Sequence, residues 1–168
     1  MSKAKRMEEG SVNRVSAIGN AAGPAAEWRR FIMTTTKLIE LAVSMKKRAY
    51  CPYSGFAVGA ALECSDGSVF TGCNIESASF SPTICAERAA AAKAVSEGHT
   101  DFLRIAVAGS GPDLCWPCGV CRQLLSEFSP DGSLRVIAVD GNGRWESATL
   151  AQLLPRAFGK HSIRRDSL

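Results

Sequence analysis

The chain has 168 residues, of which 46% are apolar and 21% are charged, and this is the composition of one folded domain of ordinary size. It excludes disorder along most of the length, collagen and coiled coil, and no apolar run approaches the roughly 18 residues of a membrane helix. The net charge is +4, but residues 33–168 carry only 14 basic and 13 acidic side chains, so we expect no surface for polyanions.

Residues 1–32 contain small residues, Gly and Pro without a sustained period, which predicts a flexible N-terminal arm, and residues 33–168 are expected to form a single domain. The arm lacks the continuous apolar stretch of a secretory signal. The seven cysteines are an odd number, which favours metal binding or catalysis over disulfides. We therefore expect a cytoplasmic protein.

The elements follow in chain order from hydrophobic periodicity and turn signals. Helices are predicted from the Thr34–Thr36 cap to about Arg48, from about Cys85 to Glu97, over 118–128 and near 150–154. Strands are predicted over 56–62, 69–73, 105–108 and 134–139, the first two as a hairpin around Gly67. Helices alternate with strands after residue 84, so we expect an α/β fold in which helices cover a mixed sheet.

Two cysteine-containing groups each open a predicted helix: Cys85-Ala86-Glu87-Arg88, and the run from Pro117 to Gln123 that contains Cys118 and Cys121. The spacing of three lets Cys118 and Cys121 reach one ion from a single helical turn. We expect Cys85 at its helix cap and Glu87 in the first turn, where both side chains reach the same site. The partial positive charge of helix N-termini favours thiolates there.

Three thiolates would leave one position of a zinc ion open for water, which zinc activates. Arg88, and as a second candidate Arg122, would hydrogen-bond the thiolates. Glu87 would carry protons from the water to a ring nitrogen and a leaving amine, so the pattern predicts hydrolytic deamination. The alternative is a closed four-cysteine structural site that includes Cys115, in a protein that is not an enzyme.

At these residues the chain resembles the cytidine deaminases, small zinc enzymes that are usually homotetramers. The likeness also covers 53–62, 71–80 and 153–158. It implies a three-layer α/β/α fold with about five strands and one Zn²⁺ per subunit. Asn74 and Glu76 would hold the ribose 3′-hydroxyl, Phe56 would pack against the pyrimidine, and the backbone at Ala86 and near Trp116 would read the base. Three further residues would reach a neighbouring subunit's active site: Ala78, Phe80 and Phe158.

The implied reaction is deamination of free cytidine and 2′-deoxycytidine to the uridine forms and ammonia, in pyrimidine salvage, with attack of a zinc-bound water at C4. Other zinc deaminases, such as blasticidin, free-base or nucleic-acid deaminases, stay open as alternatives. Departures at Ser77, Phe80 and Trp116 bear on substrate fit. A nucleic-acid partner is disfavoured, because the domain is nearly neutral and the chain has only seven Phe, three Trp and two Tyr.

Overall fold

The computed structural model describes residues 33–159 and residue 163. The elements are α2 (Thr35–Met45), η1 (Lys46–Arg48), β1 (Val58–Cys64), β2 (Val69–Cys73), α3 (Ala86–Ser96), β3 (Phe102–Gly109), α4 (Gly119–Ser126), β4 (Arg135–Val139), β5 (Trp145–Thr149) and α5 (Leu150–Leu153). The prediction of a flexible arm at 1–32 lies outside the described residues.

The strands form a five-stranded mixed sheet in the order β2-β1-β3-β4-β5. β1 is antiparallel to β2 and to β3, and β5 is antiparallel to β4. β3 and β4 run parallel, with Ile105 opposite Val136. Parallel neighbours need a crossover on one face of the sheet, and this crossover contains α4. The α/β class and the mixed sheet are therefore confirmed.

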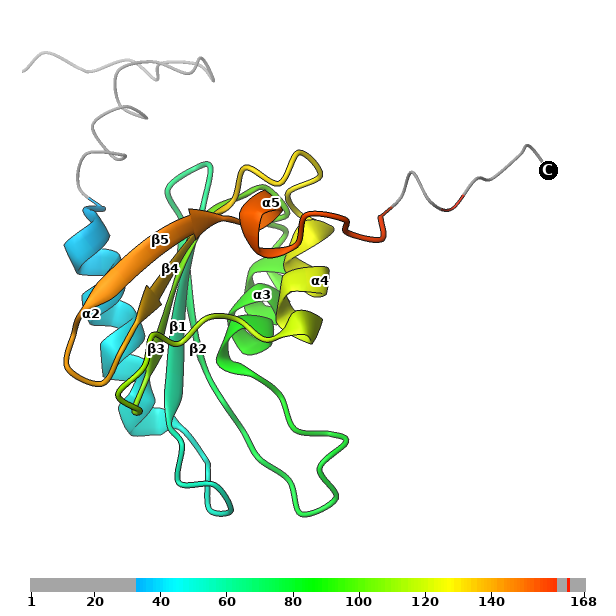
Figure 1. The fold of residues 1–168 in the computed structure, drawn as a ribbon. Coiled ribbons are helices and arrows are strands. Elements are labelled where there is room, and N and C mark those ends of the chain that lie inside the picture. Colours follow the sequence, from blue (N-terminus) through cyan, green and yellow to red (C-terminus); the bar gives the residue numbers. More distant parts are fainter. Residues whose placement is uncertain (1–32, 160–162, 164–168) are drawn as a thin grey trace, which may run out of the picture.

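The sheet lies between two helical layers, with α2 on one face and α3 and α4 on the other (Figure 1). The alternating residues of β1 contribute to both cores, because successive side chains of a strand point to opposite faces. Leu62 belongs to the cluster under α3 and α4, and Ala61 belongs to the cluster under α2. The three-layer arrangement gives α3 and α4 a common apolar support.

Two glycines allow helices to approach the sheet closely. A Cβ atom at Gly72 would lie 2.4 Å from the carbonyl oxygen of Ala86 and 2.6 Å from the nitrogen of Ala90. A Cβ atom at Gly59 would lie 2.1 Å from the carbonyl oxygen of Ala42 in α2. Buried alanines on α3 (Ala86, Ala90, Ala91 and Ala94) complete this close contact. These small residues thus determine the distance between the N-terminus of α3 and the sheet.

The helices and four of the strands lie where the periodicity predicts them, within a few residues. The difference is β5, which follows Gly143 and has an exposed, weakly apolar pattern. Such an edge strand has little period-2 signal, because one face packs poorly and the other faces water.

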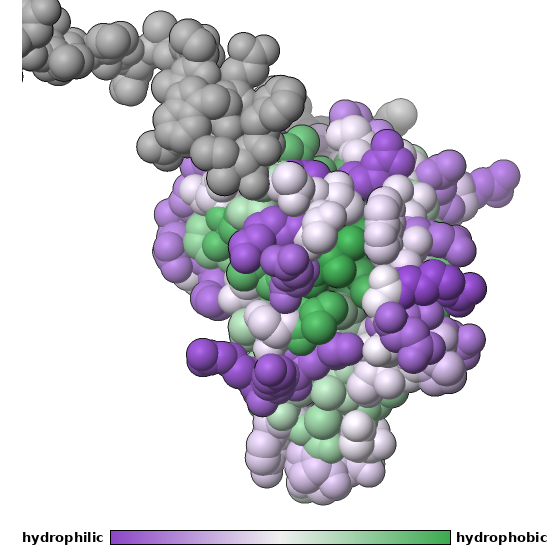
Figure 2. All heavy atoms as spheres, turned by 90° about the vertical axis from the view of Figure 1, so that its left-hand side faces the viewer, coloured by the Kyte–Doolittle hydropathy of each residue, from purple (hydrophilic) through white to green (hydrophobic). Residues whose placement is uncertain are grey.

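The surface on the α2 side is polar with a hydrophobic patch in its middle (Figure 2). Among residues 33–159, no helix has the length and apolar character needed to cross a membrane.

Candidate active site

The N-termini of α3 and α4 lie side by side and carry the cysteines. Cys85 is the N-cap of α3 and Cys118 is the N-cap of α4, both with extended backbone angles. Neither side chain caps its own helix by a hydrogen bond, so both sulfurs are free to point into the space between the helices. Cys121 lies one turn into α4 and is buried.

The three sulfurs form a compact group that fits a tetrahedral metal ion. All three lie within 4.8 Å of one another, and Sγ of Cys85 is 3.9 Å from Sγ of Cys118. Zn–S bonds of about 2.3 Å in a tetrahedron place two sulfurs about 3.8 Å apart. Thiolate sulfur is also a donor that zinc prefers. The donor set and its spacing therefore suit zinc.

The electrostatics of the group favour one thiolate and disfavour a second. Hydrogen bonds with Cys121 and Cys118, and then Arg88, lower the pKa of Cys85 to about 5. The contact with Cys85 and burial raise the pKa of Cys121. A bound cation relieves this conflict, because it compensates the charge of neighbouring thiolates.

Glu87 lies in the first turn of α3, as expected, and is only 4% exposed. Burial raises the pKa of this carboxyl, and the charge of Cys85 adds to the effect. A raised pKa brings a carboxyl group closer to the proton affinity that general acid–base catalysis needs. Glu87 and Cys85 also line the same cavity. The geometry therefore places a proton-transfer group beside the sulfurs.

The two arginines behave differently. Arg88 lies near Cys85, and its Nη2 donates a hydrogen bond of 2.6 Å to the carbonyl oxygen of Thr83. Its Nε is buried and has no partner in the described part of the chain. The guanidinium of Arg122 instead donates to the carbonyl oxygens of Pro117 and Leu153, at 2.7 and 2.9 Å. Arg122 was predicted as a second residue that hydrogen-bonds the thiolates. Its hydrogen bonds go instead to main-chain oxygens.

A cavity of about 190 Å³ opens beside the sulfurs. It is lined by Val58, Asn74, Glu76, Thr83, Ile84, Cys85, Ala86, Glu87, Cys115, Trp116 and Cys118. The chain segments that meet here come from β1, the loop after β2, the two helix N-termini and the loop after β3. Three larger cavities, two of about 540 Å³ and one of about 330 Å³, have none of the three clustered cysteines in their walls, so the small cavity is the candidate for the reaction.

Asn74 and Glu76 line this cavity and also hold the loop before β1. Asn74 accepts a hydrogen bond from the nitrogen of Val58 and donates one to the carbonyl oxygen of Phe56, at 2.9 and 2.8 Å. Oε2 of Glu76 accepts from the nitrogens of Tyr53 and Ser54, and Oε1 accepts from the Ser54 hydroxyl. The bonds from Ser54 and Tyr53 lower the pKa of Glu76. Both side chains therefore stabilise the conformation of this loop, which is a common role of polar residues in turns.

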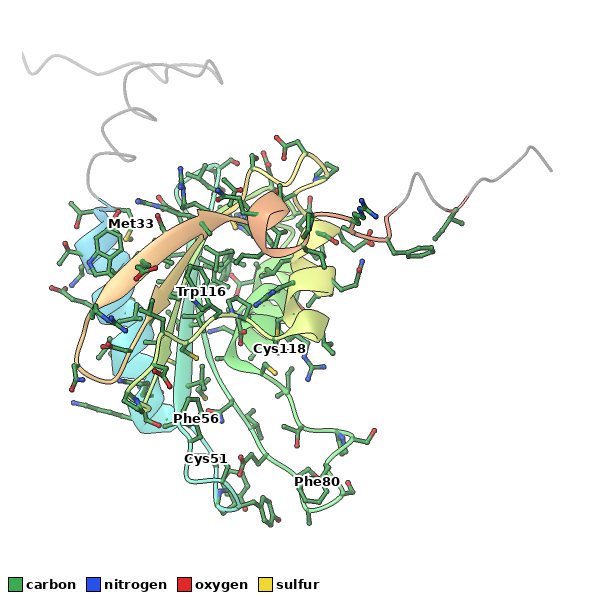
Figure 3. All side chains as sticks on the ribbon, in the orientation of Figure 1. Met33, Cys51, Phe56, Phe80, Trp116 and Cys118 are labelled. Atoms are coloured by element: carbon green, nitrogen blue, oxygen red, sulfur yellow. The ribbon has the colours of Figure 1, made fainter. Side chains whose placement is uncertain are left out.

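The aromatic residues lie farther out. Phe56 is 42% exposed and packs beside Gly109 and Gly111, outside the walls of the small cavity. Phe80 is 75% exposed, at the end of a loop that extends away from the sheet (Figure 3). Phe158 is 60% exposed, and Ala78 is exposed as well. Within one chain these residues do not meet the sulfurs.

The remaining cysteines stand apart from the cluster. Cys115 lines the cavity but is not among the three clustered sulfurs, and it packs beside Gly109. Burial raises the pKa of the Cys115 thiol to about 11. All seven cysteines lie in the described range and are free. The closed four-cysteine alternative therefore lacks geometric support.

Two residues near the cavity, Thr83 and Ser54, make contacts that no sequence motif predicted. Thr83 lines the cavity, accepts from Arg88 through its carbonyl and accepts from the nitrogen of Ser77 through its hydroxyl. Ser54 reaches Glu76 across 22 residues of sequence. Only the tertiary arrangement identifies contacts of this kind.

A three-layer α/β/α fold in which two helix N-termini bring together three cysteines and a buried glutamate defines the class of zinc-dependent deaminases. Comparison with known proteins gives the family. Residues 33–136 match the sequence model of the cytidine and deoxycytidylate deaminase zinc-binding region. The chain belongs to this family and is a hydrolytic deaminase.

Relatives of the chain agree with this assignment. It is 44% identical over 131 residues to a cytidine deaminase of Sporosarcina psychrophila, covering 78% of this chain and 96% of the relative. A crystal structure of cytidine deaminase from Burkholderia pseudomallei is 42% identical with a TM-score of 0.72, covering 75% of this chain and 100% of that one. A blasticidin-S deaminase of Bacillus cereus is 32% identical over 112 residues, covering 62% of this chain and 78% of the relative.

Proposed function

We propose that this enzyme is a zinc-dependent cytidine deaminase that converts free cytidine and 2′-deoxycytidine to uridine and 2′-deoxyuridine with release of ammonia. The observation that carries the proposal is the cluster of three cysteine sulfurs, two of which, Cys85 and Cys118, line one small cavity together with the buried Glu87. Names of relatives supply the substrate class. Its cellular role would be pyrimidine salvage.

Cys85, Cys118 and Cys121 would hold one zinc ion per subunit. When bound, zinc would supply a water molecule activated for attack on C4 of the pyrimidine. The side chain of Arg88 would draw charge from the thiolate of Cys85 and so maintain the electrophilic character of the site. Its buried Nε, which has no partner among residues 33–159, is an available donor for this purpose.

Glu87 would move the protons. Its carboxylate takes a proton from the attacking water and delivers it to N3 of the ring. A second proton passes through the same carboxyl group to the exocyclic amine. The C4–N bond then breaks as ammonia leaves and the C4 oxygen becomes a carbonyl. The water supplies one oxygen and two protons, so the atoms balance.

Glu76 and Asn74 would orient the sugar through its 3′-hydroxyl. Oε1 of Glu76 has one hydrogen-bond donor among the described residues, the Ser54 hydroxyl, and a carboxylate oxygen accepts more than one. A 3′-hydroxyl is present in both ribose and deoxyribose, which is the basis for proposing both substrates. Phe56 would pack against the pyrimidine, and the backbone at Ala86 would contact the base.

Ala78, Phe80 and Phe158 would complete the active site of a neighbouring subunit in a homotetramer. Their exposure within one chain supports this part of the proposal, since large apolar side chains at a surface often mark an interface. Mixing Glu87→Gln protein with Phe158→Ala protein tests it. Subunit exchange should regenerate sites that contain both intact residues, and a mixture no more active than its components would contradict shared sites.

The Glu87→Gln substitution tests the mechanism. We expect kcat to fall by at least about 10²-fold, because proton transfer is lost, while the zinc content of the purified protein stays unchanged. Loss of the cytosine ultraviolet band measures turnover, and metal analysis measures zinc. A variant with the parent rate would contradict the role of Glu87.

A substrate panel separates the proposal from its closest alternative. The Bacillus cereus relative favours blasticidin S as the second candidate substrate. Zinc-loaded protein should deaminate cytidine and 2′-deoxycytidine faster than blasticidin S, cytosine, adenosine or single-stranded DNA. A preference for blasticidin S would direct attention to Ser77, Phe80 and Trp116. The seven free cysteines support a reducing compartment, and we propose the cytoplasm.

A further inference from the structure

The two residues that follow Cys121 on α4 contact the C-terminal part of the domain. Arg122 joins the carbonyl oxygen of Pro117, directly before Cys118, to the carbonyl oxygen of Leu153 at the end of α5. Nε2 of Gln123 donates a hydrogen bond of 2.6 Å to the carbonyl oxygen of Phe158. The helix that carries two of the clustered cysteines therefore also holds the segment after α5, residues 154–159.

This segment has few other attachments. Within the described part of the chain, the bond from Gln123 is the only hydrogen bond to residues 155–159. A cavity of about 540 Å³ lies against the segment, with walls from the end of α4, the loop before β4 and residues 154–157. The segment is thus supported mainly at its start by α5 and near its end by Gln123.

The amide of Gln123 is held in the orientation that this bond needs. Its Nε2 also donates to the hydroxyl of Ser126 at 3.3 Å, and the same hydroxyl donates to the carbonyl oxygen of Gln123 at 2.7 Å. A side chain fixed in this way loses less conformational entropy when it binds the segment. The hydrogen bond from Gln123 is therefore a directed contact.

We infer that Gln123 is a positioning residue that anchors segment 154–159 to α4 and thereby fixes where the Phe158 ring stands on the surface that would face a neighbouring subunit. The inference rests on the proposed function in assigning Phe158 to a neighbouring active site. Gln123 itself acts through Phe158.

Two variants test the anchor. Gln123→Glu keeps the shape of the side chain but presents an oxygen to the carbonyl of Phe158, and Gln123→Met removes the donor without adding charge. The matched control is Glu127→Gln, an exposed change at the C-cap of the same helix. Brief trypsin treatment followed by intact-mass analysis measures cleavage after Arg156, which lies inside the segment.

We expect both Gln123 variants to be cleaved after Arg156 about fivefold faster than the parent, the change that corresponds to loss of one net hydrogen bond. The KM for cytidine should rise by a similar factor, while zinc content stays at the parent value. The control should match the parent in all three measurements. Parent rates of cleavage in both Gln123 variants would overturn the anchor.

A double variant shows whether Gln123 works through the aromatic ring. Adding Gln123→Glu to Phe158→Ala should raise KM no further, and independent, multiplying effects would overturn the inference. A parent KM in Phe158→Ala alone would overturn the neighbouring-site role of Phe158 that the proposed function assigns. The cleavage measurement would still report the anchor in that case, so the two failures are distinguishable.

Discussion

Glu63 is a charged residue near the end of β1, and its side chain is 1% exposed. Arg104 on β3 pairs with it and also donates to the carbonyl oxygen of Met33 and the hydroxyl of Thr35. One guanidinium thus links β1, β3 and the start of α2. Burial of a charge is tolerated only where a partner compensates it, so this residue pair is a point where a single change has a large effect.

Replacing Arg104 with Met should lower the free energy of unfolding by about 3–5 kcal/mol, because it leaves a buried carboxylate without its partner. Urea unfolding at pH 7 measures the loss. The matched control is Arg144→Met. The Arg144 side chain is 63% exposed, and its partner Asp140 keeps hydrogen bonds from the backbone nitrogens of Asn142 and Arg144, so we expect a loss of less than about 1 kcal/mol. Equal losses in the two variants would contradict the structural role of Arg104.

The hairpin of β1 and β2 is closed by a turn in which the Asp66 carboxylate accepts hydrogen bonds from the nitrogen and hydroxyl of Ser68, at 2.9 and 3.1 Å. At the scale of elements, this turn closes the β1–β2 hairpin, and the close approach of α3 to β2 brings the second helical layer onto the sheet. Both features depend on single positions in otherwise ordinary strands.

The bond from the backbone of Ser68 lowers the pKa of Asp66 below its ordinary value. A lowered pKa in the folded state means that Asp66 stabilises the fold above its ordinary pKa, and that this contribution is lost as the pH falls through the lowered value. Asp66→Asn should therefore be less stable than the parent at pH 7. The difference should shrink as the pH falls below about 4, and urea unfolding over a pH series measures it. A constant difference at every pH would argue against this account.

Gly72→Ala should push α3 away from β2, since the new methyl group would meet backbone atoms of Ala86 and Ala90. We expect a loss of about 1–3 kcal/mol in unfolding free energy, the usual cost of overpacking, and faster release of zinc to a chelator because Cys85 caps this helix. Gly119→Ala is the control, with nothing within 4 Å of the added atom, and its stability should change by less than about 1 kcal/mol. Zinc release at the parent rate in Gly72→Ala would contradict the prediction that the packing of α3 against β2 affects how tightly zinc is held.

The whole molecule is organised so that the chemistry lies at one end of two helices that share a core. Both core clusters, the three sulfurs and the cavity beside them are built from residues 33–159. The family match begins at residue 33. The domain therefore contains every group that the proposed reaction uses.

A protein that begins at Met33 should keep turnover, zinc content and, to within about 1 kcal/mol, the parent free energy of unfolding in urea, since nothing in the mechanism uses residues 1–32. Activity on cytidine and metal analysis measure the first two. Loss of turnover with retained zinc would contradict the division of the chain at residue 33 and would assign a part of the reaction to the arm.

The helices, the hairpin and the chemical class of the site could be predicted from the amino-acid sequence alone. These features depend on neighbours along the chain: the 3.6-residue period, the cap positions of Cys85 and Cys118, and the three-residue spacing to Cys121. The family resemblance added the layers of the fold and a substrate class.

Which polar groups contact one another follows from the three-dimensional arrangement of the chain and could not be predicted. Asn74 and Glu76 hold the loop before β1, Arg122 binds carbonyl oxygens, and Gln123 reaches Phe158 across 35 residues. The edge strand β5 likewise becomes visible only in its pairing with β4. Such contacts depend on distances between segments far apart in the chain, and a local pattern contains no information about those distances.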